Sequence, residues 1–221
     1  MNGRRVHTDI VSHSVPFFPT RTGAEFLEFL HALIATASSK ESPSPIEKFL
    51  GEHPGALAFV QAPKPTPKSL AQEPYFGVNA FKFVNDAGKE TYVRYRITPA
   101  AGVETYDAEE VKTKSENFLR EELIARVKGG PVVFTLSVQV AAEGDQTDNA
   151  LVHWPDSREV VELGTISLDK PVESSKQPGE QKKIIFDPIP RVKGIEPSAD
   201  PLLDMRAGIY LISGHQRRAA E

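Results

Sequence analysis

The stretch that decides the fold reads Val78-Asn-Ala-Phe-Lys-Phe-Val84, then Asn85-Asp-Ala-Gly88, then Glu90-Thr-Tyr-Val-Arg-Tyr-Arg-Ile97. Apolar and polar residues alternate in both arms, which is the period of a half-buried β-strand. The residues between the arms are typical of a turn, so the stretch predicts a β-hairpin. The side chains expected to share a face are Phe81 with Phe83, and Val93 with Tyr95 and Ile97.

Further helices and strands are expected on both sides of the hairpin. Helical spacing of apolar residues, or a β-branched run, identifies each of them. The expected helices cover about 23–37, 46–50 (ending at Gly51 and Pro54), 108–128 and 200–218, and the expected strands cover 132–142 and 160–168. Residues 9–18 and the proline-rich stretch 62–74 should be extended, and 143–191 should be irregular apart from its strand. The pattern predicts an α+β fold.

Composition limits the classes of function. The chain has 221 residues, with 26 basic and 30 acidic side chains and a net charge of −4, so no basic footprint for nucleic acid is present. It has no cysteine, which excludes disulfides, thiolate catalysis and thiolate-bound haem. No apolar run approaches the ~18 residues that span a bilayer, and the first residues do not form a secretion signal. We therefore expect a cytoplasmic location for the chain as given, with a secretion signal upstream of a misassigned start as the alternative.

The segment from Asp200 to Arg218 carries a pattern suited to binding a cofactor. Arg206 lies one helical turn before Tyr210, and Arg217 lies about two turns after it. Free tyrosine titrates near ~10, so a phenolate at neutral pH needs a neighbouring cation or a metal. Tyrosine as the axial ligand of haem iron has this requirement. The alternative for an isolated pair of this kind is a surface contact without a ligand.

Five segments, taken in order, resemble the catalases and most closely the small catalase-related peroxidases. They are 75–96, then 144–164, then Phe186-Asp-Pro, then 194–203, and finally Arg206 to Arg217. The resemblance implies a partial antiparallel catalase-type β-barrel with flanking helices within one core, 1–221. It also implies a long wrapping loop over 144–193 and a proximal haem helix over 200–218.

The resemblance assigns roles to four residues of the chain. Tyr210 matches the proximal ligand of the haem iron, and Arg206 matches the arginine that hydrogen-bonds its oxygen. Arg217 matches an arginine that pairs with a haem propionate. Phe26 matches an aromatic ring against the haem face, and its alternative is an ordinary place in a helix core.

Two positions depart from the family pattern. His13 stands where the family has a distal asparagine in an Asp-Leu-Val-x-Asn-x-x-Pro segment. It is predicted either to hydrogen-bond a peroxide as a catalytic group or to be a neutral pocket histidine without a catalytic role. Asn79 stands where larger catalases have a histidine paired to the proximal arginine, which would leave the phenolate less tuned.

The family's distal histidine comes from a segment upstream of the motif that begins here at Asp9. The chain is therefore expected to lack this front segment, with residues 1–8 as the middle of a hairpin whose first strand is missing. Asn2-Gly3 would form its turn, and the return strand would start at Arg4. An open sheet of this kind favours self-association through its unpaired edges, so a homo-oligomer is one expectation. The other histidines are expected to be structural: His7, His31, His53, His153 and His215.

The function predicted from the resemblance is that of a haem-dependent, catalase-like peroxidase. It would act on hydrogen peroxide or organic peroxides with a small reductant, and its cofactor would be haem, of the b type. The main alternative is a non-enzymatic haem-binding remnant. A haem-free protein that binds partners at an open sheet edge, and a rearranging enzyme for lipid hydroperoxides, are further alternatives.

Overall fold

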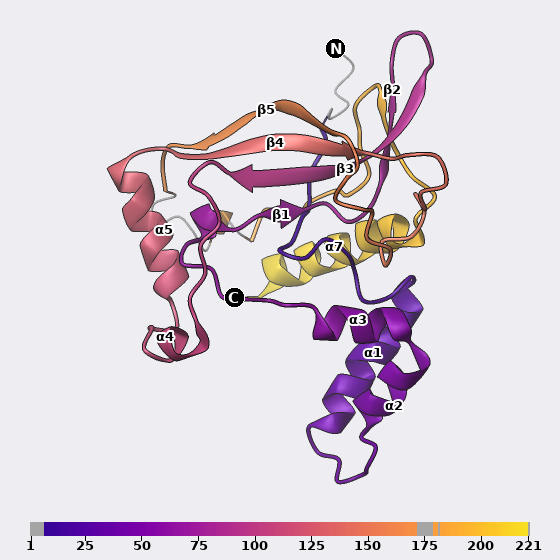
Figure 1. Ribbon diagram of the computed structural model, residues 1–221, viewed down its shortest axis with the longest axis vertical. Helices are drawn as coiled ribbons and strands as arrows, with labels where there is room; N and C mark the ends of the chain where they lie inside the picture. Colours follow the sequence, from indigo (N-terminus) through magenta and orange to yellow (C-terminus); the bar gives the residue numbers. More distant parts are fainter. Residues whose placement is uncertain (1–6, 172–178, 181, 221) are drawn as a thin grey trace.

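The computed structural model describes residues 7–171, 179–180 and 182–220. The fold is α+β, as expected, with one open antiparallel sheet flanked by helices (Figure 1). The expected return strand in residues 1–8 falls mostly outside the described residues. Within the described part of the chain, no helix is long and apolar enough to cross a membrane.

The sheet contains six strands in the order β5-β4-β3-β2-β6, and β1 pairs with β3 beside β2. Neighbouring strands are antiparallel throughout. The bounds are β1 Tyr75–Phe76, β2 Phe81–Val84, β3 Glu90–Pro99, β4 Val132–Val140, β5 Val160–Leu168 and β6 Ile195–Pro197. The strand expected over 132–142 is thus confirmed with a slightly earlier end, and the strand over 160–168 is confirmed with its bounds.

The hairpin that opened the sequence analysis is confirmed as β2 and β3. Phe81 pairs with Val93, and Val84 pairs with Glu90. Gly88 has a φ of +78° in the turn, a left-handed conformation that glycine adopts without a steric penalty. Leu203 from the last helix packs on the face of the sheet that carries Phe81, Val93 and Tyr95. The start of the C-terminal helix therefore packs on the hairpin.

The other face of β3 carries a buried arginine. Arg94 is 2% exposed, and its guanidinium lies 4.3 Å from the ring centroid of Trp154. It donates hydrogen bonds to the carbonyl oxygens of Val152 at 2.6 Å and Asn149 at 3.0 Å. These contacts hold the loop after β4 against the sheet, where residues 144–193 were expected to wrap.

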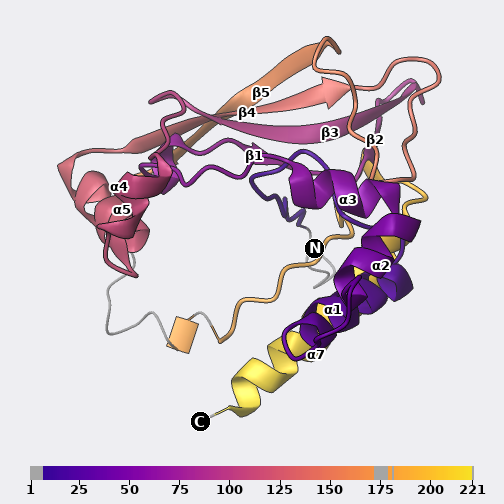
Figure 2. The same ribbon diagram turned by 60° about the horizontal axis from the view of Figure 1, so that its bottom comes forward.

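The helices gather at two ends of the sheet (Figures 1 and 2). Their bounds are α1 Gly23–Thr36, α2 Pro45–Glu52, α3 Pro54–Gln61, the one-turn η1 Leu70–Gln72, α4 Ala108–Lys112, α5 Phe118–Gly129 and α7 Pro201–Ala219. α1 and α7 approach closely, because a Cβ atom on Gly23 would lie 2.7 Å from Cγ of Met205. The helices expected over 23–37 and 200–218 are confirmed within one residue.

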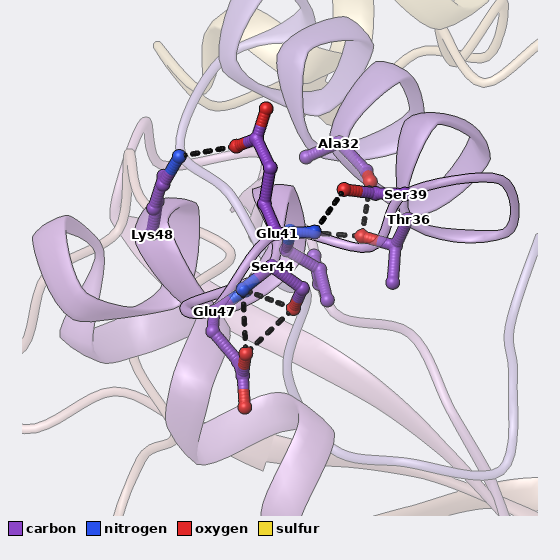
Figure 3. A network of polar contacts seen from close by, with 8 residues as sticks. Ala32, Thr36, Ser39, Glu41, Ser44, Glu47 and Lys48 are labelled. Carbon is purple, nitrogen blue, oxygen red and sulfur yellow. Dashed lines mark hydrogen bonds and ion pairs between the residues drawn. The ribbon is translucent and has the colours of Figure 1, made fainter.

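The helix expected over 46–50 is longer in the structure, where α2 covers Pro45–Glu52, and α3 was not expected. Pro54 does not end the helical region but opens α3 at its first position, where proline needs no hydrogen bond. Ser44 caps α2 through a capping box with Glu47. The backbone of Ile46 donates to Thr36 Oγ1 of α1 at 3.0 Å. Figure 3 shows Lys48 of α2 paired with Glu41, which lies in the loop between α1 and α2, at 2.6 Å.

The prediction of a single helix over 108–128 is wrong, because the structure has two helices, α4 and α5, with a non-helical stretch between them. Asp107 caps α4 by accepting from the backbone of Glu109 and Glu110, so this helix starts well. Thr113, Ser115 and Asn117 follow, and such side chains compete with the backbone for hydrogen bonds. Too few apolar residues recur at helical spacing there to stabilise one continuous helix.

The irregular stretch 143–191 agrees with the expectation in its described part, with β5 as its strand. β6 was not expected. Its three residues Ile195–Pro197 pair with β2 and extend the sheet immediately before the C-terminal helix. Too short to show an alternating pattern, this strand gives little sequence signal.

Candidate functional site

The C-terminal helix α7 is fixed at its first turn. Asp200 caps it by accepting from Leu202 N at 3.0 Å, and Pro201 occupies the first helical position. Leu202 and Leu203 are each 1% exposed and anchor the turn in two core clusters. This anchoring places the next turn of the helix, with Arg206, against the end of the hairpin.

Arg206 joins the helix to the sheet. Its Nε donates to Tyr210 Oη at 2.9 Å, and its Nη1 donates to Asn79 Oδ1. Asn79 precedes β2, is 2% exposed, and donates through Nδ2 to Asp200 Oδ2 at 2.9 Å. We call the chain Asp200–Asn79–Arg206–Tyr210 the proximal network. The expectation that Arg206 and Tyr210 share one face of a helix is confirmed.

The proximal network places charged groups in a region of the protein that is largely buried from water. Burial raises the pKa of Asp200, while the hydrogen bonds from Leu202 and Asn79 and the charges of Arg94 and Arg206 act to lower it. Burial lowers the pKa of Arg94 to about 10. Asn79 contacts a cation on one side and a carboxylate on the other without carrying a titratable proton. The guanidinium of Arg206 is therefore oriented by two acceptors, one of which is the Tyr210 oxygen.

His13 lies on the N-terminal segment that runs beside the hairpin. Its backbone forms two hydrogen bonds with Phe76, at 3.1 and 2.8 Å, and its ring meets Phe18 edge-on at 6.2 Å. Burial first, and the charge of Arg206 second, lower the pKa of His13, so the imidazole is neutral at pH 7. Its Nε2 is buried, and neither ring nitrogen is hydrogen-bonded within the described part of the chain.

A small cavity connects the N-terminal segment with the proximal network. It is lined by Ile10 and Val11, by Asn79 and Tyr95 from the hairpin region, and by Arg206. The segment that carries His13 and the helix that carries Tyr210 thus approach the same end of the sheet, although they are about 200 residues apart in the chain.

Phe26 lies in a row of aromatic rings. Its centroid is 4.9 Å from that of Phe18 and 6.3 Å from that of Phe29. It packs, half-buried, on the cluster of Phe29, Phe49 and Ala56. These contacts suffice for the ordinary core alternative, and its role against a haem stays a prediction.

Arg217 lies on the exposed half of α7. Its Nη1 donates to Ser213 Oγ at 2.9 Å, and its Nη2 donates to the carbonyl oxygen of Ile184. The guanidinium therefore ties the segment before β6 to the helix. Its pairing with a propionate stays a prediction, since these donors already have neutral acceptors.

The sequence did not identify Asp200 as part of the site. The Asp-Pro pair is typical of a helix start, and the burial of the Asp200 carboxylate and the charge of Arg94 near it depend on tertiary packing. Asn79 was noted only as a departure from a family pattern, whereas the structure shows its amide bridging Arg206 and Asp200.

Comparison with known proteins decides the family. The model of the catalase family matches residues 4–220. The chain belongs to the catalase family. Among curated relatives, it is 32% identical to a catalase-related peroxidase of Synechococcus elongatus over 92% of this chain and 60% of that protein. A catalase-related peroxidase of Mycolicibacterium paratuberculosis is 31% identical over 93% of this chain and 65% of that protein.

The fold comparison agrees with this membership. A fungal catalase crystal structure superposes with a TM-score of 0.80 at 22% identity, over 95% of this chain and 45% of the catalase. At this identity the likeness shows the catalase fold alone. The chain spans about two thirds or less of the relatives and neighbours it matches, so their length includes elements that these 221 residues do not align with.

The residues of the proximal network fit the haem of this family. A tyrosine oxygen that accepts a hydrogen bond from a guanidinium is a donor suited to ferric iron, and the sequence has no cysteine to compete as a ligand. Within the described residues, no group of three histidine, cysteine or carboxylate side chains is arranged to hold a bare metal ion. The Tyr210 oxygen beside the Arg206 guanidinium is thus a donor of the kind that a haem iron takes as its one protein ligand.

Proposed function

We propose that this member of the catalase family is a haem-dependent peroxidase that degrades hydrogen peroxide or organic peroxides with a small reductant. The observation that carries the proposal is the 2.9 Å hydrogen bond from Arg206 Nε to Tyr210 Oη, held by Asn79 and Asp200. The sequence matches to two catalase-related peroxidases support the reaction class. Haem b is the proposed cofactor.

Tyr210 would be the protein ligand of the haem iron, and the haem, when bound, supplies the redox chemistry. Arg206 donates a hydrogen bond to the tyrosine oxygen and places a fixed positive charge beside it. The network behind Arg206 keeps this charge in place, because Asn79 and Asp200 are almost fully buried. Arg217 is proposed to bind a propionate, a planar acceptor that a guanidinium matches in two hydrogen bonds. Phe26 is proposed to pack on the face of the ring.

His13 is proposed as the group that moves a proton on the peroxide side. Its neutral imidazole, with an unpartnered Nε2, can accept a proton at neutral pH. A positioned acid–base group contributes about 10²- to 10⁴-fold to a rate. This role needs Nε2 to face the peroxide.

One observation favours the second candidate, a haem-binding protein without turnover. A catalytic histidine is normally oriented by a third group that fixes its tautomer. In the described part of the chain no side chain or carbonyl is hydrogen-bonded to the ring of His13. An imidazole without such support is a weaker base for catalysis.

Titration of the purified chain with haem separates the candidates. The peroxidase proposal predicts a ferric tyrosinate absorption spectrum and peroxide consumption above that of free haem, the latter reduced at least tenfold in His13→Ala. The remnant predicts the same spectrum with consumption no higher than free haem. Tyr210→Phe should abolish the spectrum in both cases. The matched control is Tyr92→Phe, a half-buried tyrosine of β3 outside the site, which should keep it. Absence of haem uptake by the unmodified chain would overturn both.

A further inference from the structure

The alternation of β3 places Arg94 on the face of the sheet away from the hairpin core. Val93 and Tyr95 belong to that core cluster, and Arg94 lies between them. Its guanidinium donates to two carbonyl oxygens and lies 4.3 Å from the ring centroid of Trp154. A planar guanidinium with two acceptors and an aromatic ring against its face is held in one orientation. Arg94 is therefore a buried cation in a fixed position.

The loop that Arg94 holds also contacts the start of α7. The two carbonyl oxygens belong to Asn149 and Val152. Between these residues lies Ala150, which is 0% exposed and packs in one cluster with Leu202 of α7. The loop and the start of α7 accordingly lie at the same end of the sheet (Figures 1 and 2). The hydrogen bonds of Arg94 thus fix the part of the loop that packs on the first turn of α7.

The charge of Arg94 acts on the same turn through Asp200. This carboxylate caps α7 and is 3% exposed. Burial raises its pKa, whereas the hydrogen bonds from Leu202 and Asn79 and the charges of Arg94 and Arg206 oppose that rise. Burial lowers the pKa of Arg94 to about 10, and the charge of Asp200 opposes that fall. The two groups therefore stabilise each other's charge in a region where an isolated charge would be costly.

Arg94 is thus connected to the first turn of α7 twice, by the loop packed on Leu202 and by the charge of Asp200. The following turns carry Arg206 and Tyr210, whose side chains are joined at 2.9 Å. A shift of the first turn would move both side chains, because they lie on the same helix. We propose that Arg94 is a positioning residue for Tyr210, which it serves by holding the start of α7 in place.

This assignment rests on the proposed function, in which Tyr210 binds the haem iron. Its effect on the hydrogen bond between Arg206 and Tyr210 does not require haem. The two parts can therefore be tested separately, first on the full chain without haem and then with haem added.

Nuclear magnetic resonance of the full chain with ¹⁵N-labelled arginine tests the first part. Hydrogen exchange of the Arg206 Nε–H reports its hydrogen bond to Tyr210, and Arg206→Lys assigns the signal by removing it. Arg94→Gln should speed this exchange about tenfold, the size expected when a hydrogen bond to a charged group is weakened. Arg94→Lys keeps the charge but lacks the planar fork that binds two carbonyl oxygens, so it should give a smaller increase.

Arg158→Gln is the matched control. Arg158 holds another part of the same loop through Asp145, at 2.8 and 2.9 Å. Its loss should lower the free energy of unfolding and leave the exchange at Arg206 unchanged in the folded chain. A merely structural Arg94 would behave in the same way. Unchanged exchange in folded Arg94→Gln and Arg94→Lys, or an equal increase in Arg158→Gln, would overturn the assignment. If Arg94→Gln does not fold, Arg94→Lys gives the answer.

Titration with haem tests the second part. Arg94→Gln should weaken haem binding about tenfold and change the ferric tyrosinate spectrum, whereas Arg158→Gln should change neither. Unchanged haem affinity in Arg94→Gln would overturn the role of Arg94 in haem binding. If the unmodified chain takes up no haem, the proposed function fails, and the exchange at Arg206 still shows whether Arg94 positions the helix.

Discussion

The two sides of the candidate haem site are built very differently. On the proximal side, three hydrogen bonds link Asp200, Asn79, Arg206 and Tyr210, and two of these residues are 2–3% exposed. On the side of His13, the backbone is held by Phe76, while among the described residues the ring meets Phe18 edge-on and makes no hydrogen bond. One side is organised by polar contacts before any ligand binds, and the other has a buried imidazole whose Nε2 has no hydrogen-bond partner among the described residues.

This difference indicates what the chain can do on its own. A buried polar network is stable only when every member has its partner, and it then fixes one geometry. Ligation through Tyr210 is therefore better supported by the structure than proton transfer through His13. The variants below test the contrast, beginning with the network itself.

Removing the buried carboxylate should have the largest effect. Asp200→Ala leaves the charges of Arg94 and Arg206 uncompensated and removes the cap of α7, so the free energy of unfolding should fall by about 3–5 kcal/mol. Asp200→Asn keeps a capping side chain and should cost less, since burial already disfavours the charged form. Chemical denaturation measures both. Asp204→Asn, in the exposed part of the same turn, is the control. A loss there as large as that of Asp200→Ala would mean that burial is not the cause.

The bridging amide comes next. Asn79→Leu leaves Arg206 and Asp200 each without one buried partner, and the free energy of unfolding should fall by about 1–3 kcal/mol. Asn79→His can also accept and donate, so it should retain more stability. Asn117→Leu changes an exposed asparagine whose side chain makes no capping bond, and it should shift the same denaturation curve by no more than about 0.5 kcal/mol. If the leucine variant of Asn79 is no less stable than this control, the network does not hold Arg206.

The sequence predicted the proximal side better than its surroundings. Arg206 and Tyr210 are four residues apart on one helix, so helical geometry alone brings them together. Asn79 and Asp200 are 121 residues apart, and their contact depends on how β2 and α7 pack. The same limit explains the missed β6, since three residues gain strand geometry only by pairing with β2. Local periodicity identified most helices and strands, but it missed the break between α4 and α5, which lies at the polar side chains of Thr113, Ser115 and Asn117.

A substitution on the exposed half of α7 should change ligand binding more than stability. Arg217→Ala loses hydrogen bonds to Ser213 and to the Ile184 carbonyl on the surface, so the free energy of unfolding should change by no more than about 0.5 kcal/mol. If Arg217 pairs with a propionate, the affinity for haem should fall about tenfold, a loss of about 1.4 kcal/mol. Spectroscopic haem titration measures this affinity. Arg218→Ala, one residue later and also exposed, should leave it unchanged. Equal losses in the two variants would assign the effect to general surface charge.

The smallest effect is expected on the side of His13, and it should depend on pH. Because its pKa in the folded chain is lowered from 6.5, the unfolded chain binds more protons as the pH falls below about 6.5. Above that pH both states are neutral at this position and no difference arises. Below it the native chain should lose stability until the pH reaches the lowered pKa, and His13→Asn should lose less. Thermal unfolding between pH 7 and pH 5 gives the comparison, with the exposed His31→Asn as control. Parallel pH profiles for His13→Asn and the unmodified chain would show that the ring is hydrated, and the contrast between the two sides of the site would then be smaller than the contacts indicate.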